Sequence, residues 1–136
     1  MNKLKGTIKH IQSAENISIV DVEIDNQNFR AIVLETPETS SYLKEGNQVF
    51  ILFKETEVSI GKIIKGEISL SNRIKCRIKK IKKGKILTEL KLLFNDTYIT
   101  SIITTASAER LNLKEGEEVE AFIKANEVSI MEIVDG

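Results

Sequence analysis

Three hydroxyl side chains gather where a predicted strand ends and a helical turn begins, at Thr104, Thr105 and Ser107. Backbone N–H groups at a helix start lack partners inside the helix, and hydroxyls beside them add donors, so this combination suits an oxyanion. Lys124 lies in a predicted turn before the last strand, and the small Ala125 after it would let backbone N–H groups approach a ligand. These residues favour binding of a tetrahedral dianion. Ser and Thr are also ordinary helix caps, so a purely structural role stays open.

Catalytic chemistry finds little support in the sequence. His10 is the single histidine and has no partner defined by spacing, so we expect it on a solvated strand face. Cys76 falls in an alternating strand, where a small buried filler is the expected role. A single cysteine cannot form an internal disulfide or a cysteine zinc cage, and the common glycine-rich, zinc and nucleophile motifs do not occur. We predict neither catalytic residues, nor a metal site, nor a cofactor.

Length and composition narrow the class of protein further. The chain has 136 residues, 41% of them hydrophobic, and 20 Lys+Arg balance 20 Asp+Glu. This composition can build a core, and a net charge of zero argues against a general polyanion binder. No apolar run is long enough for a transmembrane helix, and the first residues lack the apolar stretch of a signal peptide. We therefore expect a cytoplasmic protein with no membrane partner.

One segment departs from this charge balance. The range 73–85 contains eight cations and no acid. Single strands of nucleic acid bind barrels through cations together with exposed aromatic rings, and aromatic residues are scarce here. The lysines also fit the solvent face of a strand and a solvated hairpin tip. We do not expect a nucleic-acid partner, although single-strand binding through this segment stays open as an alternative.

The chain repeats itself at a shift of 70 positions. Lys44-Glu45-Gly46 matches Lys114-Glu115-Gly116, and Glu57–Ile60 matches Glu127–Ile130 without a gap. We therefore predict two copies of one unit, at residues 1–68 and 69–136. Each copy has about 65 residues, a size at which a domain is only marginally stable alone. Pairing within the chain or between chains would supply the missing stability.

Each copy shows the pattern of five short strands and one helical turn. In the first strand of both copies apolar residues alternate with polar ones and then slip by one position, which indicates a β-bulge. The tips Asp25-Asn26 and Asn95-Asp96 predict turns, and Thr36-Pro37 predicts a helix start in the first copy. This is an all-β fold of two tandem five-stranded OB-like barrels, each with one short helix. The expected strands are 4–11, 20–24, 29–34, 49–53 and 57–60, then 74–81, 90–94, 98–103, 119–123 and 127–131.

The second copy resembles the Mop unit of molybdopterin-labelled proteins. The stretches that carry the resemblance are 100–104, 107–111, 113–119, 121–125 and 128–130. The first copy is similar to the related TOBE unit, most clearly over Phe53–Lys62. The resemblance implies a di-Mop protein similar to small molybdate-storage proteins and to the ligand-sensing half of molybdate-responsive regulators. Such proteins are OB-like barrels that assemble, often as trimers, and bind molybdate or tungstate at subunit interfaces.

The resemblance also implies which residues would bind the oxyanion. The opening box of the family's unit, Ser-Ala-Arg-Asn, corresponds here to Ser69-Leu70-Ser71-Asn72, with Ser71 at the arginine position. The family's loop hydroxyls match Thr104 and Ser107, and its turn lysine with the following small residue matches Lys124 and Ala125. In the first copy this turn is Lys54-Glu55, where an inward Glu55 carboxylate would repel a dianion.

These observations lead to one expected function and two alternatives. We expect a homo-oligomeric molybdate- or tungstate-binding protein for storage or homeostasis, not an enzyme, with the trimer implied only by the resemblance. One alternative is an accessory or regulatory TOBE module that acts through a transporter or regulator partner. The other is the single-strand nucleic-acid binder described above.

Overall fold

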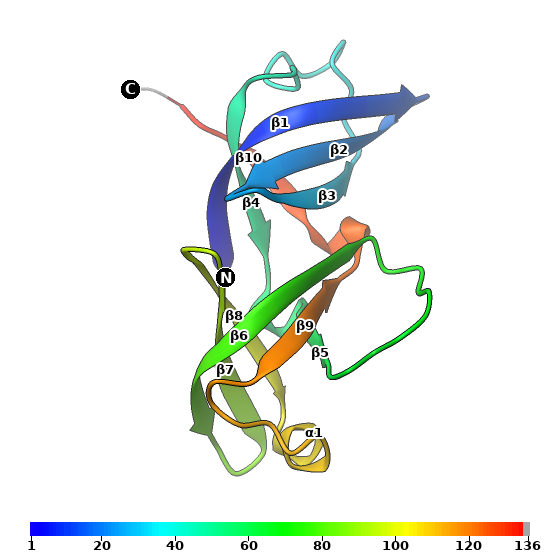
Figure 1. Ribbon diagram of the computed structural model, residues 1–136. Coiled ribbons are helices and arrows are strands. Elements are labelled where there is room, and N and C mark those ends of the chain that lie inside the picture. The colour runs from blue at the N-terminus through cyan, green and yellow to red at the C-terminus, as the bar shows by residue number, and fades with distance from the viewer. Residues whose placement is uncertain (135–136) are drawn as a thin grey trace. The chain divides into compact units, whose positions relative to one another are not determined.

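The computed structural model describes residues 1–134 of the chain, which divide into two compact units (Figure 1). Unit 1 comprises Met1–Phe53 together with the segment that begins at Lys124. Unit 2 comprises Lys54–Ile123. The chain therefore leaves unit 1 after its fourth strand, builds unit 2 and then returns. None of the helices in residues 1–134 has the length and apolar character needed to span a membrane.

Within the described residues, unit 1 is a curled antiparallel sheet of five strands. Their spatial order is β10-β4-β1-β2-β3, and a short 3-10 helix, η2 (Ala125–Glu127), precedes β10. The long first strand forms hydrogen bonds with both β2 and β4, so it holds the middle of the sheet. The strands are β1 (Asn2–Ala14), β2 (Ile17–Ile24), β3 (Gln27–Val33), β4 (Gln48–Phe53) and β10 (Ser129–Glu132).

Unit 2 has the same architecture, with the order β5-β9-β6-β7-β8. It begins with a 3-10 helix, η1 (Glu55–Glu57), and an α-helix, α1 (Thr105–Arg110), follows its strand β8 directly. The mostly-β composition and the two curled five-stranded sheets confirm the predicted OB-like fold class. The strands are β5 (Ser59–Gly61), β6 (Asn72–Lys83), β7 (Leu87–Phe94), β8 (Thr97–Thr104) and β9 (Glu118–Ile123).

The bulge predicted from the slip in alternation is present in both units. The β1–β2 register shifts between Ile8 and His10, and the β6–β7 register shifts between Ile78 and Lys80. The extra residue restores the inward direction for the apolar side chains that follow, since a slip of one residue reverses the faces of a strand. The predicted turn after the second strand is confirmed as well, because Asp25 and Asn26 adopt φ values of +50° and +66°.

Each unit buries its own apolar core inside the curl of its sheet. In unit 1 the rings of Phe29 and Phe53 stack with their centroids 6.2 Å apart, and Ile8 and Ile51 are fully buried beside the same strands. In unit 2 the largest fully buried side chains are aliphatic, and Phe94 and Phe122 are also buried; the aliphatic set is Ile74, Ile78, Leu90, Leu92, Ile99 and Ile123. Strand alternation thus produces two separate cores from one repeated pattern.

The last strand of each repeat pairs with the other repeat. Ser59 of the first repeat lies opposite Phe122, and Ser129 of the second lies opposite Leu52, so the two pairings are equivalent at the 70-residue shift. Val58 and Val128 precede these strands and are both fully buried, one in unit 2 and the other in unit 1. The boundary at residues 68 and 69 describes the sequence repeat, whereas each compact unit takes its closing strand from the other repeat.

The helix predicted in the first copy does not form. After β3 the carbonyl of Thr36 accepts hydrogen bonds from the backbone N–H groups of Thr39 and Ser40, but the turn does not continue as a helix. The Thr39 hydroxyl bonds to the backbone of Thr36, and the hydroxyls of Ser40 and Tyr42 donate to the Glu35 carboxylate. Ser and Thr side chains that bond locally compete with helical hydrogen bonding, so this segment stays a series of turns.

Candidate functional site

The predicted hydroxyl cluster lies at the start of α1 in unit 2. Thr104 is the N-cap, and its Oγ1 accepts a hydrogen bond from the Ser107 backbone N–H at 3.1 Å. The two hydroxyls also bond to each other at 2.9 Å, and an Arg110 Nη2 lies 3.4 Å from the Ser107 hydroxyl. Thr104 donates to Ser107, so the Ser107 hydroxyl proton and the Arg110 guanidinium are the donors that these bonds leave for an oxyanion.

The third hydroxyl of the sequence cluster has a structural role instead. Thr105 is buried, its Oγ1 donates to the Gly84 carbonyl at 2.8 Å, and it lies 2.8 Å from the Thr88 hydroxyl. The Thr105 N–H donates to the carbonyl of Ile86. These bonds fasten the beginning of α1 to the β6–β7 hairpin and thereby fix the position of Thr104.

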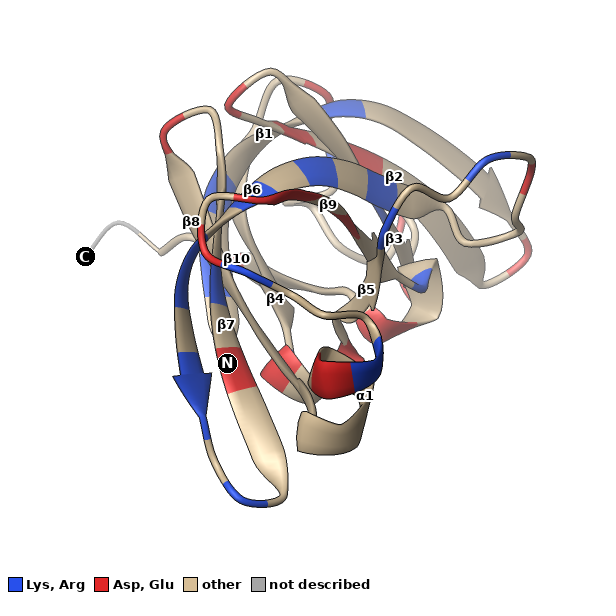
Figure 2. Cartoon of the chain, turned by 60° about the horizontal axis from the view of Figure 1, so that its bottom comes forward, with Lys and Arg blue, Asp and Glu red and all other residues tan. Residues whose placement is uncertain are grey.

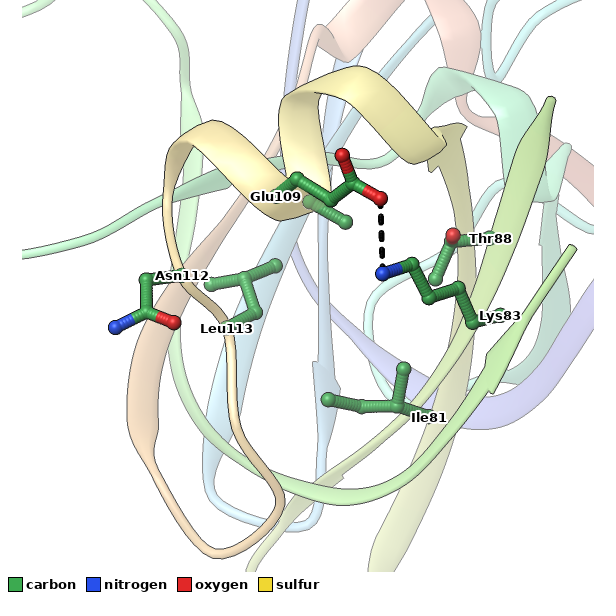
Figure 3. A pocket seen from close by; sticks show the side chains of 7 residues that line it. Ile81, Lys83, Thr88, Glu109, Asn112 and Leu113 are labelled. Atoms are coloured by element: carbon green, nitrogen blue, oxygen red, sulfur yellow. Dashed lines mark ion pairs between the residues drawn. The ribbon is translucent and has the colours of Figure 1, made fainter. Parts of the chain in front are cut away.

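A hollow lies between α1 and this hairpin (Figure 3). Glu109 projects from α1 toward Lys83 of β6, and their oxygen and nitrogen atoms are 2.8 Å apart. Ile81 and Leu113 form apolar parts of the lining, and Asn112 lies at its other side. The ion pair joins two exposed side chains, so it adds little stability, and it occupies the donor that an anion would need.

The predicted lysine turn belongs to the other unit. Lys124 is exposed and precedes η2, where the Glu127 N–H donates to the Lys124 carbonyl at 3.0 Å. Ala125 is buried, and η2 packs against β3 of unit 1. The exchange of closing strands thus assigns Lys124 and Ala125 to unit 1, whereas Thr104 and Ser107 belong to unit 2.

The corresponding turn of the first repeat occupies the same place in unit 2. Lys54 is exposed and precedes η1, which packs against β8, the strand that ends at Thr104. The buried Ser101 of β8 donates from its hydroxyl to the Val58 carbonyl at 2.6 Å and so anchors this turn. The structure therefore brings the turn containing Lys54 and Glu55 to the strand that carries the hydroxyl cluster.

The remaining predicted residues lie in or beside the segment that joins the repeats. Ser69 and Ser71 are exposed outside the regular strands, so their hydroxyls are accessible. Asn72 is almost fully buried as the first residue of β6, opposite Ile123 of β9. Its position favours a role in holding the strand end, as does that of its repeat counterpart Asn2, which is also buried.

Two ion pairs that were not anticipated from the sequence hold the joining segment against the rest of unit 2. Lys62 Nζ lies 2.7 Å from a Glu117 oxygen, and Arg73 forms two hydrogen bonds with Glu120, at 2.9 and 3.1 Å. Arg73 also donates to the carbonyls of Ile64 and Gly66. The hydrogen bond from Lys62 lowers the pKa of Glu117, and that from Arg73 lowers the pKa of Glu120. The only available signal was charge type, because the partners are about 50 positions apart.

The two residues considered for catalysis lie in settings that suit structural roles. Cys76 is buried in β6, and burial raises the pKa of its thiol to about 12, so it is a poor nucleophile at neutral pH. The His10 side chain is 65% exposed, with Nδ1 3.7 Å from a Glu45 oxygen. Among residues 1–134 the structure contains no group of three or more His, Cys, Asp or Glu that could hold a metal ion.

The fold and repeat define a class of tandem OB-like barrel proteins, and comparisons with known proteins place the chain within it. The TOBE domain family matches residues 68–130. A molybdate-bound crystal structure of the cytoplasmic molybdate-binding protein ModG superposes with a TM-score of 0.88 at 28% identity, covering 96% of this chain and 94% of that one.

Two curated relatives narrow the assignment. Molybdenum-pterin-binding protein 1 of Clostridium pasteurianum is 42% identical over 65 residues, which span 47% of this chain and 96% of that protein. Molybdenum-pterin-binding protein MopA of Rhodobacter capsulatus is 31% identical over 130 residues, which span 93% of this chain but 49% of that protein. The chain belongs to the Mop family of molybdenum-pterin-binding proteins, as a di-Mop member built from TOBE units.

Proposed function

We propose that this protein binds molybdate, or the closely similar tungstate, in the cytoplasm and thereby stores or buffers it. The observation that carries the proposal is the hydroxyl cluster at the start of α1, where the Ser107 hydroxyl accepts from Thr104 and Arg110 and its own proton is not used in these bonds. A tetrahedral dianion needs several such donors together with nearby positive charge. Its relatives support the same ligand, since they are named as molybdate- or molybdenum-pterin-binding proteins.

The proposed mechanism is reversible capture without covalent chemistry, so the protein is not an enzyme. Thr104 and Ser107 supply hydroxyl donors, Lys124 supplies charge, and the backbone N–H groups near Ala125 complete the shell. Lys54 is the equivalent cation of the other turn, while Ser69, Ser71 and Asn72 supply further donors. Following the family resemblance, we propose that the complete site forms at an interface between subunits of a homo-oligomer, which the resemblance suggests is a trimer.

Binding at a subunit interface would couple ligand and assembly. A ligand that binds the assembled state and not its separated parts stabilises the assembly by linkage. We therefore expect molybdate to raise the fraction of oligomer at a fixed protein concentration. Analytical ultracentrifugation with and without molybdate measures this fraction, and an unchanged distribution would place the site within a single chain.

Calorimetric titration with molybdate, tungstate, sulfate and phosphate tests the proposal directly. We expect heat from the first two anions. Lys124→Ala should weaken binding by about 10- to 100-fold, which corresponds to one lost charge-assisted hydrogen bond. His10→Ala is the matched control and should leave affinity unchanged. Absence of heat from all four anions would reject the function, and equal effects of the two variants would show that the site lies elsewhere.

A second function has one specific observation in its favour. Glu55 occupies the turn that packs against β8, and its carboxylate would oppose a dianion there. A module that acts through a transporter or regulator partner would not need a working site in both repeats. Capture of a single defined transporter or regulator subunit from native cells, together with failure to bind molybdate, would favour this alternative.

A further inference from the structure

The outer surface of unit 2 carries a group of lysines that the proposed function does not use. We call Lys80, Lys82 and Lys91 the lysine face. They are exposed on neighbouring strands, whereas the adjacent Ile78, Leu90 and Leu92 point into the core. Lys and Arg recur along β6 and at the tip of the β6–β7 hairpin (Figure 2). The members of the lysine face therefore share one side of the sheet.

The cross-strand pairing places like charges together. Lys80 of β6 lies directly opposite Lys91 of β7, while Lys82 lies opposite Glu89. Like charges directly opposite each other destabilise a sheet. Within residues 1–134 none of the three ammonium groups is within ion-pair distance of a carboxylate, although Arg73, Arg77 and Lys83 of the same strand each pair with a glutamate. The lysine face thus retains its positive charge, whereas glutamates neutralise the neighbouring cations of the same strand.

An exposed aromatic ring completes this surface. Tyr98 of β8 is 45% exposed, and the Lys91 Nζ lies 4.5 Å from its ring centroid. Thr100, also on β8, is opposite Lys91 and lines a shallow hollow together with the three lysines and Glu89. The scarcity of aromatic residues argued against single-strand binding in the sequence, but the structure places one of the few beside the cations.

The first repeat supplies an internal comparison. The positions equivalent to Lys91 and Thr100 are Asp21 and Arg30, whose Oδ1 and Nε atoms form an ion pair at 2.9 Å. Partial burial alone would favour the neutral acid, but the hydrogen bond and charge of Arg30 keep the pKa of Asp21 below its ordinary value. The equivalent surface of unit 1 is therefore neutralised internally, and the lysine face is specific to the second repeat.

We propose that the lysine face and Tyr98 bind single-stranded nucleic acid, a function separate from oxyanion capture. β7 and β8 are the second and third strands of the second repeat, and OB folds bind oligonucleotides on the face of their second and third strands. Lys80 and Lys82 lie two residues apart along β6, and Lys91 lies on the next strand, so the three ammonium groups can contact successive phosphates of one strand. The Tyr98 ring offers a base a stacking surface that does not depend on sequence.

Fluorescence anisotropy with a labelled 12-nucleotide oligothymidylate tests this proposal. We expect binding at low salt that weakens as salt rises, with a slope of log K against log salt near −2 for about three neutralised phosphates. The triple variant Lys80→Gln, Lys82→Gln, Lys91→Gln should weaken binding at least tenfold and flatten the slope. The matched control replaces the exposed Lys9, Lys44 and Lys65 with Gln and removes the same charge elsewhere. Equal loss in both triple variants, or no binding at low salt, would overturn the proposal.

Substitutions of Tyr98 test whether the surface binds nucleic acid specifically or any polyanion. Tyr98→Ala should weaken oligothymidylate binding about fivefold or more, the usual effect of losing one stacked base, while Tyr98→Phe should retain it. Inorganic polyphosphate, which has no bases, should compete poorly and be indifferent to either change. Effective competition by polyphosphate with no effect of Tyr98→Ala would show a general anion surface and contradict the proposal. Circular dichroism of each variant verifies that the sheets are intact.

Discussion

Position 6 of the first repeat and position 76 of the second show how one residue adjusts a repeated core. A Cβ on Gly6 would lie 2.5 Å from Ile24 Cγ1 and 2.7 Å from the Glu23 carbonyl oxygen, distances at which something must move. The second repeat accepts Cys76 at the equivalent place, buried, with its Sγ 3.4 Å from the Ile74 carbonyl oxygen. In the first repeat there is no room for a side chain at position 6, so glycine is required. In the second repeat the Cys76 side chain fills the space at the equivalent position.

Gly6→Ala should destabilise the protein by about 1–3 kcal/mol, because the added methyl group overpacks a closed site. Cys76→Ala removes one buried sulfur and should cost only about 1 kcal/mol, through a small cavity. Urea denaturation of the two variants measures both free energies of unfolding. A Gly6→Ala protein as stable as the wild type would mean that β1 and β2 separate more easily than their packing suggests.

Thr104 combines a structural and a proposed binding role, and substitutions can separate them. Thr104→Ala removes the side-chain acceptor for the Ser107 N–H and should reduce stability by about 0.5–2 kcal/mol. Thr104→Ser keeps the acceptor oxygen, so its free energy of unfolding should stay within a few tenths of a kcal/mol of the wild-type value. Thermal and urea unfolding of the two variants give the comparison. Equal losses would show that the Thr104 methyl group, and not its hydroxyl, secures the start of α1.

At the scale of the element, local patterns account for most of what could be predicted. The alternation of apolar residues is a property of each strand by itself, so β1, β6, their bulges and their turns were predictable. The helix in the first copy was wrong because Thr36, Thr39 and Ser40 satisfy backbone and carboxylate groups with their own side chains. The ion pairs that hold the joining segment were not predictable, because Arg73 and Glu120 meet only through the β6–β9 pairing.

The ion pairs of Glu117 and Glu120 predict a contribution to stability that is lost in acid. The pKa values of Glu117 and Glu120 are lowered in the folded protein, so each carboxylate stabilises the fold above its ordinary pKa of 4.5. The contribution is lost as pH falls below that value and through the lowered pKa. Glu120→Gln should therefore be less stable than the wild type at neutral pH, and this difference should shrink at acid pH as the Glu120 carboxylate becomes protonated. Urea unfolding at both pH values measures the difference, and a constant difference would exclude the ionised carboxylate as its cause.

At the scale of the whole molecule, the exchange of closing strands decides which residues share a unit. β5 pairs with β9 and β10 pairs with β4 in equivalent registers, and the unexchanged pairings would use the same residue types. Sequence reasoning cannot distinguish two arrangements with nearly identical contacts. For the same reason it predicted the residue types of the candidate site, Lys124 and Thr104 among them, but not which turn accompanies which hydroxyl cluster.

Val128 and Val58 provide a direct test of the exchange. Val128→Ala should cost about 1–3 kcal/mol through lost burial, and amide hydrogen exchange should accelerate most in β4 of unit 1. Val58→Ala should instead accelerate exchange in β9 of unit 2. Mass spectrometry of peptides from the two sheets measures both effects. Acceleration in β9 for Val128→Ala would mean that each repeat keeps its own closing strand.

The return of the chain to unit 1 also sets an order of events during synthesis. Every strand of unit 2 precedes Lys124 in the sequence, whereas unit 1 needs β10 (Ser129–Glu132) to complete its sheet. On the ribosome, the unit begun second can therefore finish first, and the unit begun first waits with the edge of β4 unpaired. Domains fold as they emerge, and an unpaired strand edge invites association between chains. We therefore expect association between nascent chains to concentrate at the β4 edge until β10 has been synthesised, and to fall once that strand has paired.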